Sequence, residues 1–233
     1  MSLLSRWIPT GSLSLDRALE GGLPPGTITL LYGEAETGKT SLAMQCAVNS
    51  ARLGCKTLFI DSDGDFSPER LSQIASADLE DVSRMIILVS PSSFNEQATV
   101  IDGLEQYVNE KFGLIAFDTV TSLYRSELRD KAETYKLNRE LNRQIATLTE
   151  IAKTLEIPVL LTSQVRSILT LGDAATSPVA TRVLKFWSHA VVNLSRTDQQ
   201  NVIRAIVEKS SGKEKKLTFY LHIEKDGVHD YNH

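Results

Sequence analysis

The sequence predicts an α/β fold in which a mainly parallel, twisted sheet is flanked by helices and continues into a C-terminal antiparallel extension. In the first 190 residues, short apolar runs bounded by turn residues alternate with segments whose apolar residues recur every three or four positions. This alternation is typical of parallel strands joined by crossover helices. After residue 190, three apolar runs follow one another with only short polar turns between them, which indicates an antiparallel meander.

The expected elements follow from these patterns in chain order. Five apolar runs predict the strands of the parallel part, at residues 27–32, 56–61, 85–89, 113–118 and 157–163. Apolar residues at helical spacing predict helices at residues 41–53, 95–112 and 132–156. Pro158 cannot continue the last of these helices, because proline lacks the backbone N–H. The meander strands are expected at residues 190–196, 201–209 and 216–227.

Length and composition indicate one globular domain over residues 1–233, with residues 1–9 as a short N-terminal segment. The 25 basic and 29 acidic side chains give a formal net charge of -4, so overall charge does not favour a general polyanion binder, whereas local basic patches remain possible. The two cysteines show no metal-ligand spacing. We find no secretory signal and no run of 18 apolar residues, and therefore expect a cytoplasmic protein without a membrane span.

The strongest local signal is the segment Gly-Glu-Ala-Glu-Thr-Gly-Lys-Thr at residues 33–40, which matches the phosphate-binding loop G-x-x-x-x-G-K-[ST]. Its place between an expected strand and an expected helix favours a phosphate loop over an ordinary glycine-rich turn. Lys39 is expected to contact the β- and γ-phosphates of ATP, and the Thr40 hydroxyl to bind Mg²⁺. The candidate nucleotide-binding residues of this segment are Gly33, Glu36, Thr37, Gly38, Lys39, Thr40 and Ser41.

A second metal ligand is expected at Asp118, which ends the continuous apolar run "GLIAFD". A carboxylate there is costly unless a cation or hydrogen bonds compensate its charge. The alternative is a side chain that caps the following turn. Together with the phosphate loop, Asp118 indicates a P-loop nucleotidase that binds ATP and Mg²⁺.

Five segments, in this order, resemble the RecA/RadA recombinase superfamily. They are "PTGSLSLDRALEGGLPPGTI", "GEAETGKT", "FIDSDGDFSPERL", "LIAFDTVTSLYR" and "PVLLTSQV", and the resemblance extends over residues 10–230. It implies a RecA-like P-loop ATPase core and is closest to the archaeal RadB-type paralogues. The chain reaches this core by residues 7–10, which leaves no room for the helical N-terminal domain of the full recombinases or for the Phe-x-x-Ala linker that joins their subunits. Oligomers are therefore expected only by another route.

The resemblance also assigns catalytic residues, which are Asp63, Lys39 and Gln164. Asp63 stands where the family has the glutamate that activates water, and its carboxylate is about 1 Å shorter in reach, so we expect a weak, DNA-dependent ATPase. The alternative is that residues 61–65 only form a capped acidic turn. Gln164 matches the glutamine that senses the γ-phosphate, and a strand-end amide bonded to backbone is the alternative. Glu34 and Glu36 are expected to point away from the phosphates.

Arg70 matches the family arginine that stacks on adenine, for which a guanidinium plane is suited; a solvated helix arginine is the alternative. Two loops of the family bind DNA, and here they correspond to residues 124–136 and 164–185. Their candidate DNA-binding residues are Arg125, Arg129, Arg166 and Arg182. Such contacts give salt-sensitive, sequence-independent affinity, and the alternative is solvated charge on loops.

The expected function is that of a DNA repair and homologous recombination accessory protein, which binds ATP and DNA, with single strands favoured. The partners that the resemblance implies are the main recombinase and a Holliday-junction resolvase. Two alternatives remain: a KaiC-like signalling ATPase without DNA function, and a nucleotide-regulated protein-interaction module.

Overall fold

The computed structural model describes residues 6–129, 131–164 and 179–231. Nine strands form one sheet in the order β3-β2-β4-β5-β1-β6-β7-β8-β9. Neighbouring strands are parallel from β3 to β6 and antiparallel from β6 to β9. The predicted fold class is therefore confirmed.

The parallel part consists of β1 (Ile28–Gly33), β2 (Lys56–Asp61), β3 (Ile86–Val89), β4 (Phe112–Asp118), β5 (Val159–Gln164) and β6 (Ala190–Arg196). β1, β2, β4 and β5 are almost entirely buried, as expected for strands covered by helices on both faces. The antiparallel part adds β7 (Val202–Ser210), β8 (Lys213–Glu224) and β9 (Gly227–Asp230). The single last strand predicted at residues 216–227 was wrong, because the chain reverses between Glu224 and Gly227 and pairs back on β8 as β9.

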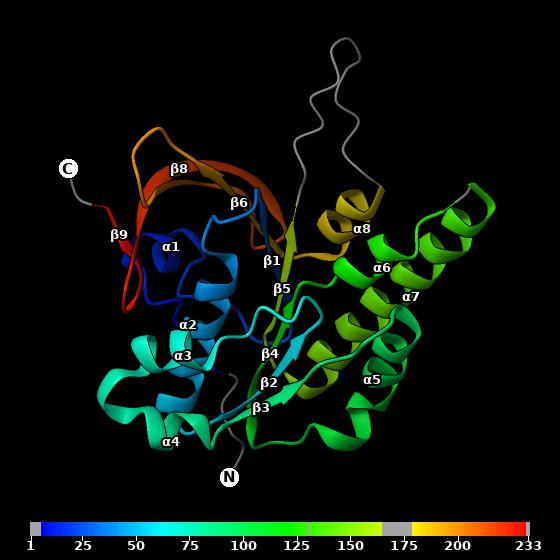
Figure 1. The fold of residues 1–233 in the computed structure, drawn as a ribbon, viewed down its shortest axis with the longest axis horizontal. Coiled ribbons are helices and arrows are strands. Elements are labelled where there is room, and N and C mark those ends of the chain that lie inside the picture. Colours follow the sequence, from blue (N-terminus) through cyan, green and yellow to red (C-terminus); the bar gives the residue numbers. More distant parts are fainter. Residues whose placement is uncertain (1–5, 130, 165–178, 232–233) are drawn as a thin grey trace.

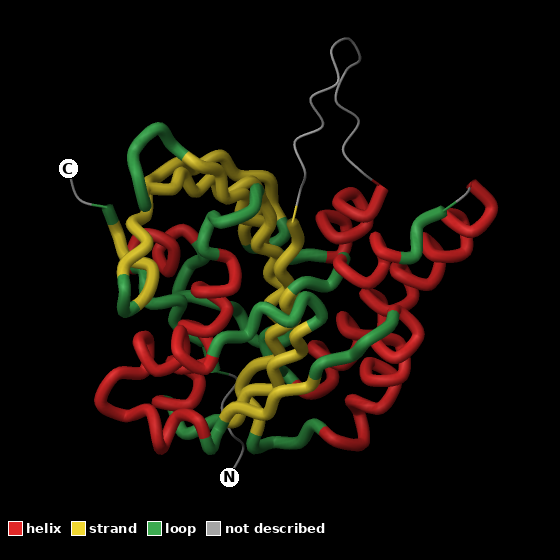
Figure 2. Tube along the Cα trace, in the orientation of Figure 1, coloured by secondary structure: helices red, strands yellow, loops and turns green. Residues whose placement is uncertain are grey.

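Two helical layers cover the sheet (Figures 1 and 2). One contains α1 (Leu13–Ala18), α2 (Lys39–Arg52), α3 (Pro68–Ala75), the short 3₁₀ helix Ser76–Asp78 and α4 (Leu79–Ser83). The other contains α5 (Phe94–Tyr107), α6 (Ser122–Ser126), α7 (Lys131–Leu155) and α8 (Val179–Trp187). Each layer packs on its own apolar cluster, one around Leu42 and Phe59 and the other around Phe117 and Ile145.

The helix predicted at residues 95–112 was too long. α5 ends at Tyr107, and the next residue, Val108, has an extended backbone. Phe112 then pairs with Lys56 as the first residue of β4, so sheet pairing prevails over the helical spacing of the apolar residues. The long helix predicted before Pro158 is confirmed as α7.

Candidate functional site

The carboxyl ends of the parallel strands meet at one edge of the sheet, where β1, β2, β4 and β5 end at Gly33, Asp61, Asp118 and Gln164. A cavity of about 420 Å³ lies at this edge. Residues from four segments line it: residues 35–41 and Met44 of the loop after β1 and of α2, then Asp63, Asp65, Ser67 and Arg70, then Thr119, and finally Gln164. Ligand sites of open α/β sheets lie at this position.

The loop between β1 and α2 depends on two glycines. A Cβ atom on Gly33 would lie 1.9 Å from the carbonyl oxygen of Leu194, so the close approach of β6 admits only glycine. Gly38 has φ of 76° and precedes the first residue of α2. The backbone N–H groups at this helix end have no intrahelical partners, and they attract anions such as phosphate.

Lys39, the first residue of α2, is buried at the floor of the cavity. Its ammonium group donates to the Glu34 carbonyl oxygen and, at 3.2 Å, to the hydroxyl oxygen of Thr37. Burial lowers the pKa of Lys39 to about 8, although the carboxylates of Asp118 and Asp63 counteract part of that effect. The lysine thus rests against its own loop, where phosphate oxygens can replace these acceptors and favour its charged form.

Asp118 is buried at the end of β4, and its two carboxylate oxygens differ in their hydrogen bonding. Oδ1 accepts a hydrogen bond from the Thr162 hydroxyl, whereas Oδ2 has no partner among the residues that the structure describes. Burial raises the pKa of Asp118, and the hydroxyls of Thr162 and Thr40 offset this only in part. A buried oxygen without a partner beside the Thr40 hydroxyl fits Mg²⁺, which prefers oxygen ligands and retains several waters.

The acidic segment after β2 contains two side chains with different roles. Asp61 caps the turn, since its carboxylate accepts from the backbone N–H of Gly64 at 2.9 Å and of Phe66 at 3.1 Å. Asp63 instead faces the cavity, and its Oδ2 accepts a 2.7 Å hydrogen bond from the Thr119 hydroxyl. The capped-turn alternative thus describes Asp61, whereas Asp63 lies beside Lys39 and Thr40 in the lining of the cavity.

Arg70 and Gln164 occupy other parts of the lining. The Arg70 guanidinium donates to the Ser41 hydroxyl at 3.1 Å and to the Lys225 carbonyl oxygen at 2.6 Å, which fixes α3 against α2 and the β8–β9 turn. Gln164 is the last residue of β5 and is paired with Gly33 of β1. Its carbonyl oxygen accepts a 2.5 Å hydrogen bond from Arg125, so α6 is attached to the end of this strand.

Arg196, the last residue of β6, was not predicted as a site residue. Its guanidinium donates to the Ala35 carbonyl oxygen at 3.0 Å and forms a 2.8 Å ion pair with Glu36, and its backbone N–H donates to the Glu34 carboxylate at 3.2 Å. Arg196 therefore attaches both loop glutamates to the end of β6. A carboxylate that is paired in this way repels phosphate less than a free one.

Gln97 is a second residue that the sequence did not indicate. It is fully buried on α5, and its amide group donates to the Val120 carbonyl oxygen at 3.3 Å and to Gln144 of α7 at 2.8 Å. Its own oxygen accepts a 3.4 Å hydrogen bond from Ser62. Gln97 thus joins the turns that carry Asp63 and Thr119.

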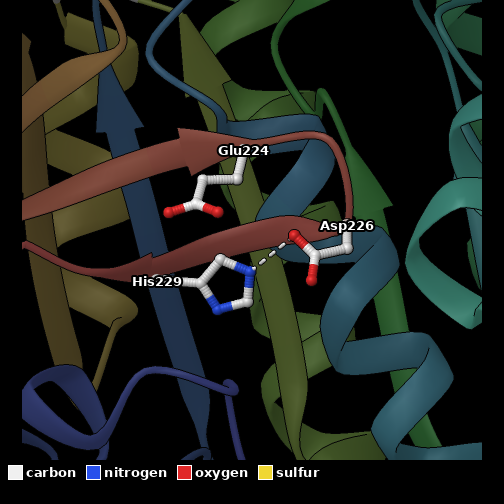
Figure 3. A group of neighbouring side chains, drawn as sticks. All are labelled: Glu224, Asp226 and His229. Carbon is white, nitrogen blue, oxygen red and sulfur yellow. Dashed lines mark hydrogen bonds and ion pairs between the residues drawn. The ribbon is translucent and has the colours of Figure 1, made fainter.

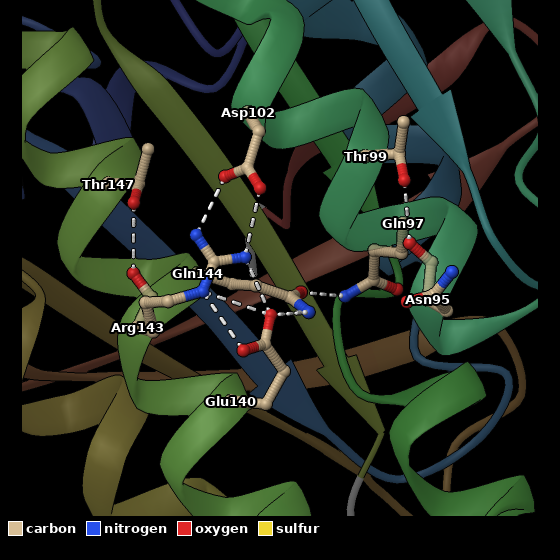
Figure 4. A network of polar contacts seen from close by, with 8 residues as sticks. All are labelled: Asn95, Gln97, Thr99, Asp102, Glu140, Arg143, Gln144 and Thr147. Atoms are coloured by element: carbon tan, nitrogen blue, oxygen red, sulfur yellow. Dashed lines mark hydrogen bonds and ion pairs between the residues drawn. The ribbon is translucent and has the colours of Figure 1, made fainter.

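The polar network continues from Gln97 to the protein surface (Figure 4). Gln144 donates to Glu140 at 3.1 Å, and Arg143 forms 2.7 Å ion pairs with both Glu140 and Asp102. The network therefore connects α5 with α7 behind the cavity.

The candidate DNA-binding arginines lie at different places. Arg125 is half-buried against Gln164, and Arg129 is exposed in a groove of about 520 Å³ beside α7. Arg182 is exposed on α8, at one wall of a groove of about 960 Å³. The other lining residues of that larger groove are Lys185, Phe186, Val191, Ile206, Glu208, Lys209, Glu214, Lys215 and Lys216. Arg166 lies outside the described residues.

The comparisons with known proteins agree with this geometry. The profile of the Rad51 family matches residues 5–231. A Thermococcus kodakarensis protein described as "DNA repair and recombination protein RadB" is 34% identical over 226 residues, which cover 96% of this chain and 99% of that protein. A protein of the same description from Methanosphaera stadtmanae is 32% identical over 192 residues, covering 82% of this chain and 81% of the relative.

A solved structure, described as "Crystal structure of the RadB recombinase", superimposes with a TM-score of 0.79 at 30% sequence identity. The match covers 97% of this chain and 100% of that one. In the described part of the chain, every helix is too short or too polar to cross a membrane. The chain therefore belongs to the Rad51 family, with RadB-type proteins among its relatives.

Proposed function

We propose that this chain is a DNA repair and recombination protein of the RadB type, a single RecA-like core that binds Mg²⁺-ATP, hydrolyses it slowly and binds DNA. The nucleotide part is supported above all by the Oδ2 atom of buried Asp118, which has no hydrogen-bond partner among the described residues, while the carboxylate interacts with the Thr40 hydroxyl and the Lys39 ammonium. A phosphate loop without a nucleotide function would not need a buried, unsatisfied carboxylate there.

Each residue has a distinct role in this proposal. The loop amides and Lys39 bind the phosphates, and Arg70 stacks on the base. Thr40 and Asp118 hold Mg²⁺, which neutralises charge on the β- and γ-phosphates. Asp63, oriented by Thr119, accepts a proton from the attacking water. Gln164 contacts the γ-phosphate from the end of β5.

Slow turnover follows from the length of the Asp63 side chain. Aspartate places its carboxylate about 1 Å short of where glutamate would reach, and displacement of this order costs about 10²-fold in rate. The hydrogen bond from Thr119 fixes that short side chain on the side of the cavity that the end of β4 forms. ATP then acts mainly as a bound ligand that is hydrolysed slowly.

DNA binding is proposed at Arg129, Arg166 and Arg182. Arg125 supports this surface by attaching α6 to the end of β5. The groove beside Arg182 supports this, since five cationic side chains line it against two glutamates, and Phe186, which is 75% exposed, offers a face for base stacking. The favoured ligand is single-stranded DNA. Partners of the same pathway are the main recombinase and a junction resolvase, and co-purification with and without ATP tests them.

The deciding experiment measures binding of a fluorescent single-stranded oligonucleotide over a series of salt concentrations, with and without Mg²⁺-ATP. We expect log affinity to fall linearly with log salt, and Arg182→Ala to reduce that slope by about 0.7. Arg84→Ala is the matched control, because this exposed arginine lies at the end of α4 in the opposite helical layer. Absence of DNA binding at low salt in both nucleotide states would instead favour a KaiC-like signalling ATPase.

A further inference from the structure

Three potential metal ligands meet at the turn between the last two strands, apart from the nucleotide cavity. Glu224 ends β8, Asp226 lies in the turn and His229 belongs to β9. Their ligand atoms all lie within 4.8 Å of one another (Figure 3). A cluster of this size has room for one ion, since ligand atoms sit about 2.0–2.2 Å from zinc.

Strand register places a second histidine on the same face. His222 of β8 is directly opposite His229 of β9, and residues that face each other in an antiparallel pair point to the same side of the sheet. Glu224 follows His222 by two positions and so shares that side. The intervening pair, Ile223 and Val228, points the other way, toward Gly38 at the start of α2.

The turn that carries these side chains is held from its inner side. Gln45 of α2 makes two hydrogen bonds with the backbone of Val228, accepting from its N–H at 2.7 Å and donating to its carbonyl at 3.1 Å. Arg70 donates to the Lys225 carbonyl oxygen at 2.6 Å. The four side chains are therefore displayed on a backbone that is already fixed, which reduces the entropy lost on metal binding.

The existing contacts pair each histidine with a carboxylate. His229 Nε2 lies 3.0 Å from Asp226 Oδ1, and His222 Nδ1 lies 3.0 Å from Glu224 Oε1. Imidazole nitrogens and carboxylates within reach of one another are the donor set of zinc sites.

We propose that Glu224, Asp226 and His229 bind one Zn²⁺ ion at the β8–β9 turn, with His222 at the facing position orienting the Glu224 carboxylate. The imidazole donor of His229 distinguishes this site from one for Mg²⁺ or Ca²⁺, which take oxygen ligands. Because the ligands come from both strands and from the turn between them, the ion ties the end of the sheet together. It also braces the backbone to which Arg70 is attached.

The test is a zinc titration of the purified, untagged full chain in competition with a chromophoric chelator. One equivalent of Zn²⁺ should bind per chain, and His229→Gln or Asp226→Asn should each weaken binding by at least about tenfold, as loss of even a supporting residue does. The matched control is His189→Gln, because this histidine lies in the described part of the chain and does not belong to the cluster. This control should bind zinc as the parent does.

Thermal unfolding supplies an independent readout. Excess ZnCl₂ should raise the Tm of the parent, since a ligand that binds only the folded state stabilises it, and should leave the Tm of His229→Gln unchanged. MgCl₂ should not reproduce the zinc effect at this site. The proposal is overturned if no stoichiometric zinc binding is found, or if the cluster variants bind zinc as tightly as the parent.

Discussion

The Thr119 hydroxyl, one residue after β4, donates a 2.7 Å hydrogen bond to Oδ2 of Asp63, two residues after β2. This contact joins the two acidic strand ends of the nucleotide cavity across neighbouring strands. It also fixes the direction of the Asp63 carboxylate. In the mechanism that we propose, the rate of hydrolysis depends on the reach of this side chain.

Asp63→Glu is expected to raise the steady-state rate of phosphate release from ATP by up to about 10²-fold, because the longer side chain restores the missing 1 Å of reach. Asp65→Glu is the control, since it adds the same methylene in the same turn. An unchanged or lower rate in Asp63→Glu would count against Asp63 as the residue that activates water.

ATP affinity should depend on pH through Lys39. Its pKa of about 8 in the free protein means that the ammonium form is lost as pH rises above that value. Bound phosphates favour the charged form and raise this pKa, so ATP affinity should fall by up to about tenfold per pH unit above pH 8. Titration calorimetry from neutral to alkaline pH measures this. In Lys39→Met the affinity should be weak and lack that dependence, and a pH-independent parent would contradict the prediction.

Arg196→Ala should weaken ATP binding several-fold, because Glu36 loses the cation that pairs with its carboxylate, whereas the backbone N–H that binds Glu34 is retained. The folded state should lose less than about 1 kcal/mol, since the ion pair is exposed. The double variant Arg196→Ala with Glu36→Gln should recover part of the affinity. Equal ATP affinity in the parent and in Arg196→Ala would show that the ion pair between Arg196 and Glu36 has no influence on the loop.

Gln97→Leu should lower both stability and turnover. The substitution leaves the buried groups of Val120, Ser62 and Gln144 without their partner, at a cost of about 1–3 kcal/mol in the free energy of unfolding for each unsatisfied group. Turnover should fall more than ATP affinity, because the turns that carry Asp63 and Thr119 lose their common anchor. Denaturant unfolding and phosphate release measure the two effects.

The control for Gln97→Leu is Thr99→Ala on the same helix. Thr99 is exposed and its hydroxyl donates only to the Asn95 carbonyl oxygen, one turn away. Removal of the Thr99 hydroxyl should change neither the free energy of unfolding nor the rate of phosphate release appreciably. If Gln97→Leu lowers stability but leaves turnover as it is in Thr99→Ala, the network of Figure 4 stabilises α5 without positioning the site.

The elements that carry chemistry could be predicted because their signals are local. The phosphate loop is a contiguous motif, and Asp118 ends an apolar run that can only be a buried strand. The gathering of the strand ends at one edge then follows from the parallel arrangement of the strands, whereas the order of the strands in the sheet was not predicted. The split of the last strand was missed because the predicted strand was extended through Glu-Lys-Asp-Gly at residues 224–227, although this polar segment ends in glycine as turns do.

The missed residues act over long sequence separations. Arg196 contacts Glu36 from 160 positions away, and Gln97 contacts Gln144 from 47 positions away. An arginine at a strand end or a glutamine in a helix carries no periodic or motif signal, so only the fold reveals its partner. Thr119 was not singled out for the same reason, although it directly follows Asp118.

In the proposed site, Asp118 and Thr40 hold Mg²⁺ beside a triphosphate bound by Lys39. Calorimetric titration of ATP, with MgCl₂ and with EDTA in its place, tests this arrangement. We expect one ATP to bind per chain, clearly more tightly with Mg²⁺, and we expect no such difference in Thr40→Ala. ATP binding that is absent, or equally strong with and without Mg²⁺, would contradict it.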